Sequence, residues 1–389
     1  MPLPSPARSL AIIITASLPL VSASPALTDD SQCGCYVTNG SEVGYFTSHK
    51  FFDFRNLGQY QGVPSPITDK NASALASPTS SYFTTDSWTQ MWDIQSWNNS
   101  GGARSDATTL MVNSPNNVYI EQSADTSSGA QTWLTLRTTK LPGFQTAAEI
   151  ASKAQGFEFL SMRMLARTIG ASGGCTAMFT YRQSPDLATV QEADLEVRTR
   201  DPRNTIQYTN QPSYTKNGDT VDDATVNATL PNGLDWTNWT IHRLDWTPKQ
   251  STWYVDGQKV AAISFQAPRD ASYIILNSWS DGGQWTGNMS LNDAAYLQIQ
   301  WFEVVYNATD KSKRDGVGDG SQSRLGRLLR RDSSQATCKA VCSVDETSKT
   351  GQPVMLWNNG ASTLLGRTST AIWTPLLVAV ILLLPSFAL

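Results

Sequence analysis

WYVDGQKVAAI (residues 253–263) places two short apolar segments on either side of Asp256-Gly257. Aspartate followed by glycine supplies the positive φ angles of a primed turn, so this stretch predicts a β-hairpin. In residues 158–166 and 297–301, apolar side chains recur at every second position, which is the period of a strand with one buried face. Such strand signals dominate residues 80–307, and no long helical period interrupts them. Many short strands with regular turns predict an all-β fold of the β-sandwich type.

The composition excludes one class of partner. The chain has 389 residues, of which 40% are hydrophobic and 16% charged, enough to bury at least one sizeable core. Its formal net charge of -4 and its isoelectric point near 5.3 leave no basic surface of the kind that neutralises phosphates. We therefore expect no nucleic acid partner.

Both ends of the chain have the features of targeting signals. Arg8 precedes an apolar run over residues 10–21 that is shorter than the ~20 residues a bilayer-spanning helix needs, so residues 1–23 are predicted to be a removed signal peptide. At the other end, small residues at 359–362 and a polar spacer precede an apolar tail. This layout favours glycosylphosphatidylinositol (GPI) attachment at Asn359 or Gly360 over a plain transmembrane helix, because nothing charged follows the tail. The protein is expected at the cell surface, held to the plasma membrane or the cell wall by this lipid anchor.

Secretion gives meaning to the Asn-x-Ser/Thr triplets, since each offers an amide for glycosylation. The predicted acceptors are Asn39, Asn71, Asn98, Asn227, Asn238, Asn288 and Asn307.

Five cysteines enter the same oxidising compartment, so one is left unpaired. Cys33 and Cys35 are too close to bridge each other comfortably, and Cys338 and Cys342 lie near the other end of the ectodomain. We expect the first pair to bridge to the second, in an order that the sequence leaves open. Cys175 lies in an apolar, strand-like stretch and is expected to be a buried free thiol.

The segment that most strongly indicates a catalytic site is QEADLEV, residues 191–197. On a strand, Glu192, Asp194 and Glu196 point one way, while the apolar residues between them point to the core. Neighbouring carboxyl groups raise each other's pKa by like-charge repulsion. Retaining glycosidases use a carboxylate nucleophile and a carboxylic acid about 5 to 5.5 Å apart. Because backbone rise puts Glu192 and Glu196 roughly 13 Å apart at Cα, their side chains must lean together on a curved strand.

The same residues and spacings also fit other kinds of site. By spacing alone, a solvated acidic strand face or a calcium-binding edge would explain the same three carboxyls. Residues 170–174 match a nucleophile-elbow pattern, but that motif needs a following helix, and residues 175–181 predict a strand. With His49 and His242 as the chain's two histidines, a serine hydrolase and a zinc site are both disfavoured. We expect no metal and no organic cofactor.

The motif Glu-Ala-Asp-Leu-Glu resembles the Glu-x-Asp-x-Glu signature of glycoside hydrolase family 16, which includes laminarinases, lichenases and fungal transglycosylases that join chitin to glucan. Residues 206–212, 242–248, 253–257 and 277–283 also resemble segments of fungal members, so the resemblance covers roughly residues 80–307. It implies a jelly-roll β-sandwich of the concanavalin A-like lectin/glucanase type, with the catalytic strand in a concave cleft. It further implies that Glu192 is the nucleophile, Glu196 the acid/base, and Asp194 the residue that orients the nucleophile or shares its proton. Ala193 replaces the usual bulky aliphatic residue, which leaves substrate choice open.

Sugar binding needs flat aromatic faces and hydrogen-bonding groups. Trp279 and Trp285 flank a Gly-rich turn at 281–283, where a loop can place them at a cleft. Tyr208 and Asn210 lie on the strand expected to follow the catalytic one. We expect these four residues to contact substrate.

The predicted organisation has four parts: a signal peptide (1–23), a glycosidase β-sandwich with an N-terminal extension (36–309), a Gly/Ser/Arg-rich linker with a Cys pair (310–360), and a removed GPI propeptide (361–389). The expected activity is that of a retaining endo-β-glucanase or transglycosylase. Its expected substrate is β-1,3 or mixed β-1,3/1,4 glucan of the cell wall, with chitin as a further acceptor. The rival hypothesis is a non-catalytic, lectin-like glycan-binding sandwich, against which the intact carboxyl triplet argues.

Overall fold

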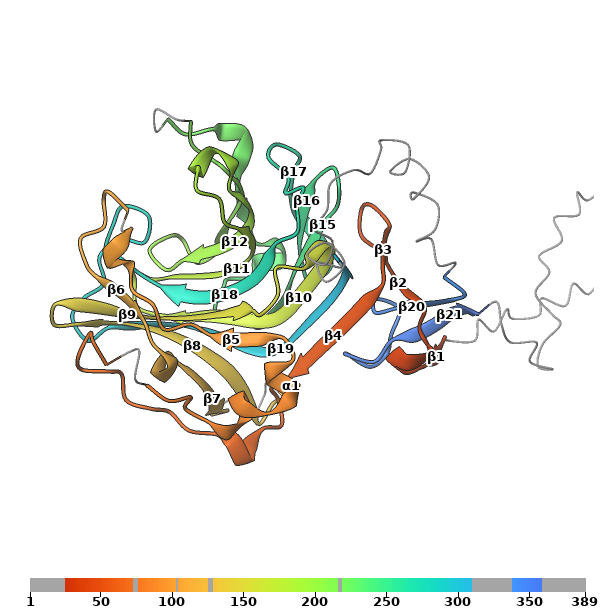
Figure 1. The fold of residues 1–389 in the computed structure, drawn as a ribbon, viewed down its shortest axis with the longest axis horizontal. Coiled ribbons are helices and arrows are strands. Elements are labelled where there is room, and N and C mark those ends of the chain that lie inside the picture. The colour runs from red at the N-terminus through yellow and green to blue at the C-terminus, as the bar shows by residue number, and fades with distance from the viewer. Residues whose placement is uncertain are drawn as a thin grey trace, which may run out of the picture.

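The computed structural model describes residues 25–72, 76–102, 104–124, 129–215, 219–309 and 338–358. They form a large β-sandwich with a smaller sheet beside it (Figure 1). The predicted signal peptide, residues 310–337 of the predicted linker, and the predicted attachment residues with the tail behind them lie outside the described residues.

The first sheet of the sandwich is antiparallel, and the strand with the three carboxyls lies inside it. In spatial order it contains β14 (Thr225–Thr229), β13 (Thr205–Gln211), β12 (Gln191–Arg198), β11 (Cys175–Arg182), β18 (Tyr273–Trp279), β9 (Phe144–Ser152) and β5 (Trp92–Ile94).

The second sheet packs against the face of the first sheet that is turned away from the carboxyls, and the two sheets share β9. One end of β9 pairs with β8 and the other with β18, so the strand passes from one layer to the other. The sheet contains, in order, β7 (Val118–Gln122), β8 (Thr132–Leu141), β19 (Ala294–Ala308), β10 (Phe157–Gly170), β15 (Thr240–Trp246), β16 (Ser251–Val255) and β17 (Gln258–Ile263), with β4 (Ser48–Asp53) also on β19 and β6 (Met111–Asn113) parallel to β9.

The apolar faces of the two layers pack into one core. The predicted alternation on β10 is confirmed, because Leu160, Met162 and Met164 are all buried in it. On β19 the alternation changes phase: a register shift opposite Leu165 and Ala166 puts Phe302 in the core. Trp301, which the sequence placed on the core face, lies outside that core and packs near Phe51 instead.

The predicted hairpin is also confirmed. β16 and β17 are joined by Asp256 and Gly257, whose φ angles are 47° and 78°. Two successive positive φ angles are what a primed turn requires, and glycine adopts one without steric cost. Together with the two packed antiparallel sheets, this establishes the predicted all-β, jelly-roll sandwich.

Helical segments are short, and within the described ranges none is both long and apolar enough to cross a membrane. Residues 81–89 hold an aromatic cluster in which Tyr82 and Trp88 pack against Phe54, and Phe83 packs against Trp88. The helical turns are α1 (Asp86–Thr89) and the 3₁₀ segments η1 (Asp30–Gln32), η2 (Gly58–Tyr60), η4 (Ser81–Thr84), η5 (Asn99–Gly101), η6 (Pro115–Asn117), η8 (Leu187–Thr189), η9 (Asp222–Ala224) and η10 (Pro231–Gly233).

The two ends of the described chain meet in the smaller sheet. Disulfides join Cys33 to Cys342 and Cys35 to Cys338, which confirms the predicted pairing of the two ends and gives its order. Cys175 is free and buried, as expected. Residues 338–358, which the sequence assigned to a linker, are thus part of this sheet. Its strands are β1 (Ala26–Leu27), β21 (Val354–Asn358), β20 (Ala340–Ser343), β2 (Cys35–Thr38) and β3 (Gly44–Phe46).

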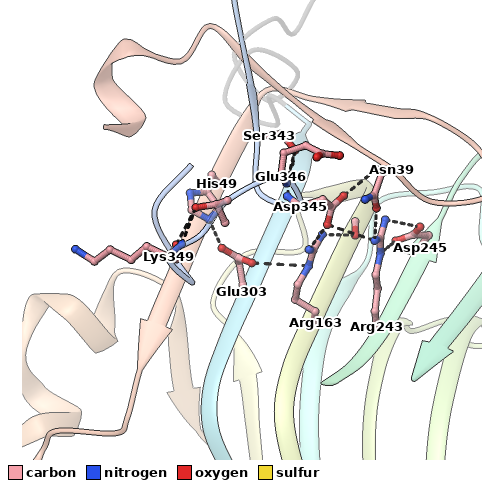
Figure 2. A network of polar contacts seen from close by, with 12 residues as sticks. Asn39, His49, Arg163, Arg243, Asp245, Glu303, Ser343, Asp345, Glu346 and Lys349 are labelled. Carbon is pink, nitrogen blue, oxygen red and sulfur yellow. Dashed lines mark hydrogen bonds and ion pairs between the residues drawn. The ribbon is translucent and has the colours of Figure 1, made fainter. Parts of the chain in front are cut away.

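A buried polar network joins the smaller sheet to the second sheet of the sandwich (Figure 2). Asp345, just after β20, accepts hydrogen bonds from Arg163 of β10 and Arg243 of β15. Arg243 also pairs with Asp245 (Nε to Oδ1, 2.6 Å), and Arg163 Nε lies 3.8 Å from Glu303 Oε2. Loss of one member would leave a buried charge uncompensated, so the network fixes the C-terminal segment to the sandwich.

His49 of β4 extends this network and makes the stability of the fold depend on pH. Its Nδ1 lies 2.7 Å from Asp30 Oδ1 and its Nε2 lies 3.1 Å from Glu303 Oε1. Burial alone would lower the pKa of His49, but the hydrogen bonds to these two carboxylates outweigh burial and raise it to about 9. The imidazolium therefore stabilises the folded protein fully below pH 6.5, its ordinary pKa, and that contribution is lost as the pH rises through about 9.

We expect His49→Gln to remove this titration. The fall in the free energy of unfolding between pH 6.5 and 9.5 should shrink by on the order of 2–3 kcal/mol relative to wild type, as measured by urea denaturation at fixed pH. His242→Gln is the matched control, because burial lowers the pKa of His242 to about 4 and keeps it neutral over this range. An unchanged pH slope in His49→Gln would contradict the assignment.

Candidate active site

Strand β12 turns its three carboxyl residues toward a cleft in the first sheet. Glu192, Asp194 and Glu196 line a cavity of about 500 Å³. The alternate residues Ala193 and Leu195 are buried in the core on the opposite side of the strand. This is the one-faced arrangement that strand alternation predicts.

Neighbouring strands supply the rest of the cleft floor. The register of β11 places Ala177 beside Glu196, Phe179 beside Asp194, and Tyr181 beside Glu192. The other lining residues come from further strands and loops: Trp97, Arg104, Glu149, Gln211, Ser213, Tyr214, Ile275, Trp279 and Trp285.

A second, larger hollow of about 960 Å³ continues from this cleft. The two share Glu192, Tyr181 and Tyr214 among their lining residues. The added walls come from the loops around Asp106 and Asp186. The carboxyl groups therefore lie along a groove that continues to one side of them, which has room for a chain-like ligand.

Asp194 and Glu192 share a hydrogen bond. Burial raises the pKa of Asp194 well above its usual range, and the negative charges of Glu192 and Glu196 add to this. Burial also raises the pKa of Glu192, the charge of Glu196 adds to it, and a hydrogen bond with Asp194 partly offsets both. Asp194 is therefore the carboxyl that keeps its proton and donates it in a hydrogen bond to the Glu192 carboxylate.

Glu196 has a different set of neighbours. Burial raises the pKa of this carboxyl, while hydrogen bonds from Cys175 and Trp285 and the nearby Arg198 and Arg104 lower it in part. The Cys175 thiol lies 3.4 Å and the Trp285 indole Nε1 3.1 Å from Glu196 Oε1. Hydrogen-bond donors and cations thus favour the Glu196 carboxylate. The Glu192 carboxylate is stabilised by a hydrogen bond from one protonated neighbour, Asp194.

Two of the four predicted substrate-binding residues face the cleft, and two do not. Trp279 and Trp285 line it, as expected. Tyr208 is fully buried in the core and packs against Trp253, with ring centroids 5.4 Å apart. Asn210 is fully buried too, and its amide donates to the backbone carbonyls of Ile263 (3.2 Å) and Phe265 (2.9 Å).

The correction for Tyr208 and Asn210 has a simple cause. On β13, Gln207, Thr209 and Gln211 pair directly with the three carboxyl residues of β12 and share their face. The even-numbered residues between them point to the opposite, core side. The strand was predicted correctly, but which of its residues share the face of the β12 carboxyls depends on the pairing register, which the sequence does not display.

Several cleft residues carried no recognisable signal in the sequence. Glu149 of β9 accepts a hydrogen bond from Trp97 Nε1 at 3.1 Å. Burial raises the pKa of Glu149, while Trp97 and Asn277 of β18 lower it by hydrogen bonding. Gln211 hydrogen-bonds to Asp194, and its own Oε1 accepts from the backbone N–H (2.8 Å) and hydroxyl (2.9 Å) of Ser213. These groups come from segments far apart in the chain, so only the folded sheet brings them together.

The predicted glycosylation sites differ in access. Six of the seven asparagines are exposed: Asn39, Asn71, Asn98, Asn227, Asn238 and Asn288. Asn307 is half-buried, and its amide donates to the carbonyl of Tyr45 at 3.2 Å.

The described part of the chain contains no group of three or more His, Cys, Asp or Glu side chains that could hold a metal ion.

Comparison with known proteins shows which family the site resembles. Residues 111–303 match the model of Glycosyl hydrolases family 16. The chain is 27% identical over 133 residues to the Beta-glucanase of Bacillus subtilis (strain 168), and 27% identical over 132 residues to that of Bacillus licheniformis. Each match covers 33% of this chain and 51% of the relative, so the chain spans about half the length of these curated relatives.

Solved structures of similar proteins were also found. The Bacillus licheniformis beta-glucanase has a TM-score of 0.43 at 22% identity, covering 55% of this chain and 92% of that one. The laminarinase catalytic domain from Thermotoga maritima has a TM-score of 0.43 at 19% identity, covering 57% and 92%. The matched segment contains the whole of β12 and most strands of the cleft. By this match, residues 111–303 of the chain are similar to Glycosyl hydrolases family 16.

Proposed function

We propose that the protein is a retaining glycoside hydrolase that cleaves or transfers β-glucan chains internally. The observation that carries the proposal is the line of carboxyls on β12 facing an aromatic-walled groove inside a region similar to family 16. A groove suits an internal stretch of polysaccharide better than a closed pocket, which would suit a chain end. Similarity to proteins named Beta-glucanase supports β-glucan as the substrate class. Within that class we propose β-1,3 or mixed β-1,3/1,4 linkages.

The first chemical step uses both glutamates. The Glu192 carboxylate attacks the anomeric carbon while Glu196 gives its proton to the glycosidic oxygen, so the bond to the leaving sugar breaks as the ester to Glu192 forms. The protonated Asp194 hydrogen-bonds to Glu192 and keeps it oriented. The leaving sugar departs with the proton from Glu196, and the configuration at the anomeric carbon is inverted once.

The second step restores the enzyme. Glu196, now a carboxylate, takes a proton from water or from a sugar hydroxyl, whose oxygen attacks the anomeric carbon and releases Glu192. Formation of the ester has removed the negative charge of Glu192, which lowers the pKa of Glu196 and suits it to act as a base. Two inversions give net retention. Water as the acceptor makes the protein a hydrolase, and a sugar hydroxyl makes it a transglycosylase.

The proposed cellular setting follows from the two chain ends. A secreted protein held by a lipid anchor at Asn359 or Gly360 would work at the plasma membrane or in the cell wall. There its glucan substrate would be remodelled, and chitin could serve as the acceptor of a transferred chain.

Product analysis tests the proposal. The protein is incubated with laminarin, lichenan and chitin oligomers, with and without labelled acceptor oligosaccharides. We expect internal cleavage of a β-glucan, with the first-formed reducing ends in the β configuration by proton NMR. Labelled products of increased length would establish transfer. Tight binding of the oligomers without any cleavage would contradict the proposal and favour the lectin-like alternative.

A further inference from the structure

We infer that Cys175 and Trp285 form a two-donor clamp on Glu196 and decide which of its oxygens carries the catalytic proton. The inference rests on the proposed function and goes beyond it, because it assigns positioning roles to two residues that do not themselves exchange protons with substrate.

The two donors of the clamp come from different parts of the fold. Cys175 is the first residue of β11 and lies diagonally across from Glu196, which pairs with Ala177. Trp285 lies in the loop between β18 and β19. Their donor atoms, Sγ at 3.4 Å and Nε1 at 3.1 Å, both meet the same oxygen, Glu196 Oε1.

Both donors are fixed in their donor state. The Cys175 side chain is fully buried, and burial together with the charge of Glu196 raises the pKa of its thiol well above the usual range. The thiol therefore stays protonated and can act as a donor. An indole N–H is a donor in any case. The guanidinium of Arg198 lies 4.5 Å from the Trp285 ring centroid and holds the ring by a cation–π contact.

The geometry has a consequence at the level of single atoms. An oxygen that already accepts two hydrogen bonds is a poor place for a proton. When Glu196 is the acid, its proton must therefore sit on Oε2. The carboxyl has one orientation and one acidic oxygen, so the proton is held in place before substrate binds.

The clamp also affects the acidity of Glu196. Both donors favour the carboxylate, which is the form needed when Glu196 acts as a base in the second step. Without them, Glu196 should hold its proton to higher pH. A purely structural role for Cys175 and Trp285 would leave that titration unchanged.

The test compares pH profiles of Cys175→Ala and Trp285→Phe, the second of which keeps an aromatic ring but loses the N–H. In each variant the alkaline limb of the kcat/KM profile should shift to higher pH by about half a pH unit or more. At a fixed pH on that limb, this shift equals about a threefold change in relative activity. Cys175→Ser keeps a donor and should move the limb less than Cys175→Ala. Trp279→Phe is the matched control: it alters the same cleft wall, so KM should change while the limb stays in place.

A second readout does not depend on activity. The pKa of Glu196 is followed by carbon NMR of protein labelled at the glutamate carboxyls, with Glu196→Gln used to assign the signal. Correctly folded Cys175→Ala and Trp285→Phe proteins, judged by thermal melting, should both show a raised pKa. An unchanged titration of Glu196 in both variants would overturn the clamp. A wild-type protein that cleaves no glycan would overturn the proposed function instead, and the NMR result would still decide the clamp.

Discussion

Glu192→Gln is expected to lower kcat on β-glucan by about 10⁴-fold or more, because it removes the only group proposed to attack the anomeric carbon. The amide has nearly the same shape, so the cleft should remain intact. Folding should be unaffected or slightly improved, since one of several crowded carboxyls no longer carries a charge. Turnover is measured by reducing-end release from laminarin and lichenan.

Two controls separate loss of chemistry from loss of the site. Oligosaccharide binding, measured by calorimetry, should survive in Glu192→Gln because the aromatic walls formed by Trp97, Trp279 and Trp285 are unchanged. Glu158→Gln makes the same substitution on β10, away from the cleft lining, and should retain wild-type turnover. Wild-type cleavage by Glu192→Gln would refute the role proposed for Glu192.

Local patterns in the sequence predicted local structure well. The two-residue period on β10 and the turn at Asp256-Gly257 both depend on neighbours in the chain, and both appear as predicted. The face shared by Glu192, Asp194 and Glu196 follows from the same alternation along one strand. These features needed no knowledge of which strands lie side by side.

Features that depend on pairing between strands were beyond the sequence. A single register shift on β19 exchanged Trp301 for Phe302 at the core. The register of β13 against β12 turned Tyr208 and Asn210 away from the cleft. A change of one residue in pairing moves every side chain to the other face, and the chain alone does not show where such a change occurs.

The smaller sheet shows a further limit. The placement of the cysteines predicted that the two chain ends are linked, and the disulfides join residues with sequence separations of 309 and 303. That both ends also pair as strands of one sheet was not predicted, because strand pairing between such distant segments leaves no local pattern in the chain.

The surroundings of Glu192 and Glu196 stabilise the charged forms of the two residues to different degrees. Cys175, Trp285 and Arg198 all favour the ionised form of Glu196, which is the form a nucleophile needs. Glu192 has Asp194 as its hydrogen-bonding neighbour. Burial and the negative charge of Glu196 both oppose the ionised form of Glu192 more strongly. The proposed roles follow the family motif, and the reverse roles would follow from these resting-state charges alone. The two assignments predict opposite stereochemistry in a rescue experiment.

Glu196→Ala should lower activity on glucan by roughly 10²–10⁴-fold. With aryl glycosides, whose leaving groups need no protonation, formation of the ester at Glu192 should be slowed much less. Added azide should restore turnover of the aryl glycoside by attacking the ester at Glu192, and the product should be the β-glycosyl azide, with retained configuration. In Glu192→Ala, azide takes the place of the missing nucleophile and attacks the substrate directly, so the product should be the inverted α-glycosyl azide. The anomeric coupling constant in the proton NMR spectrum distinguishes the two azides. An α product from Glu196→Ala together with a β product from Glu192→Ala would reverse the roles, because only the variant that keeps its nucleophile can pass through two inversions.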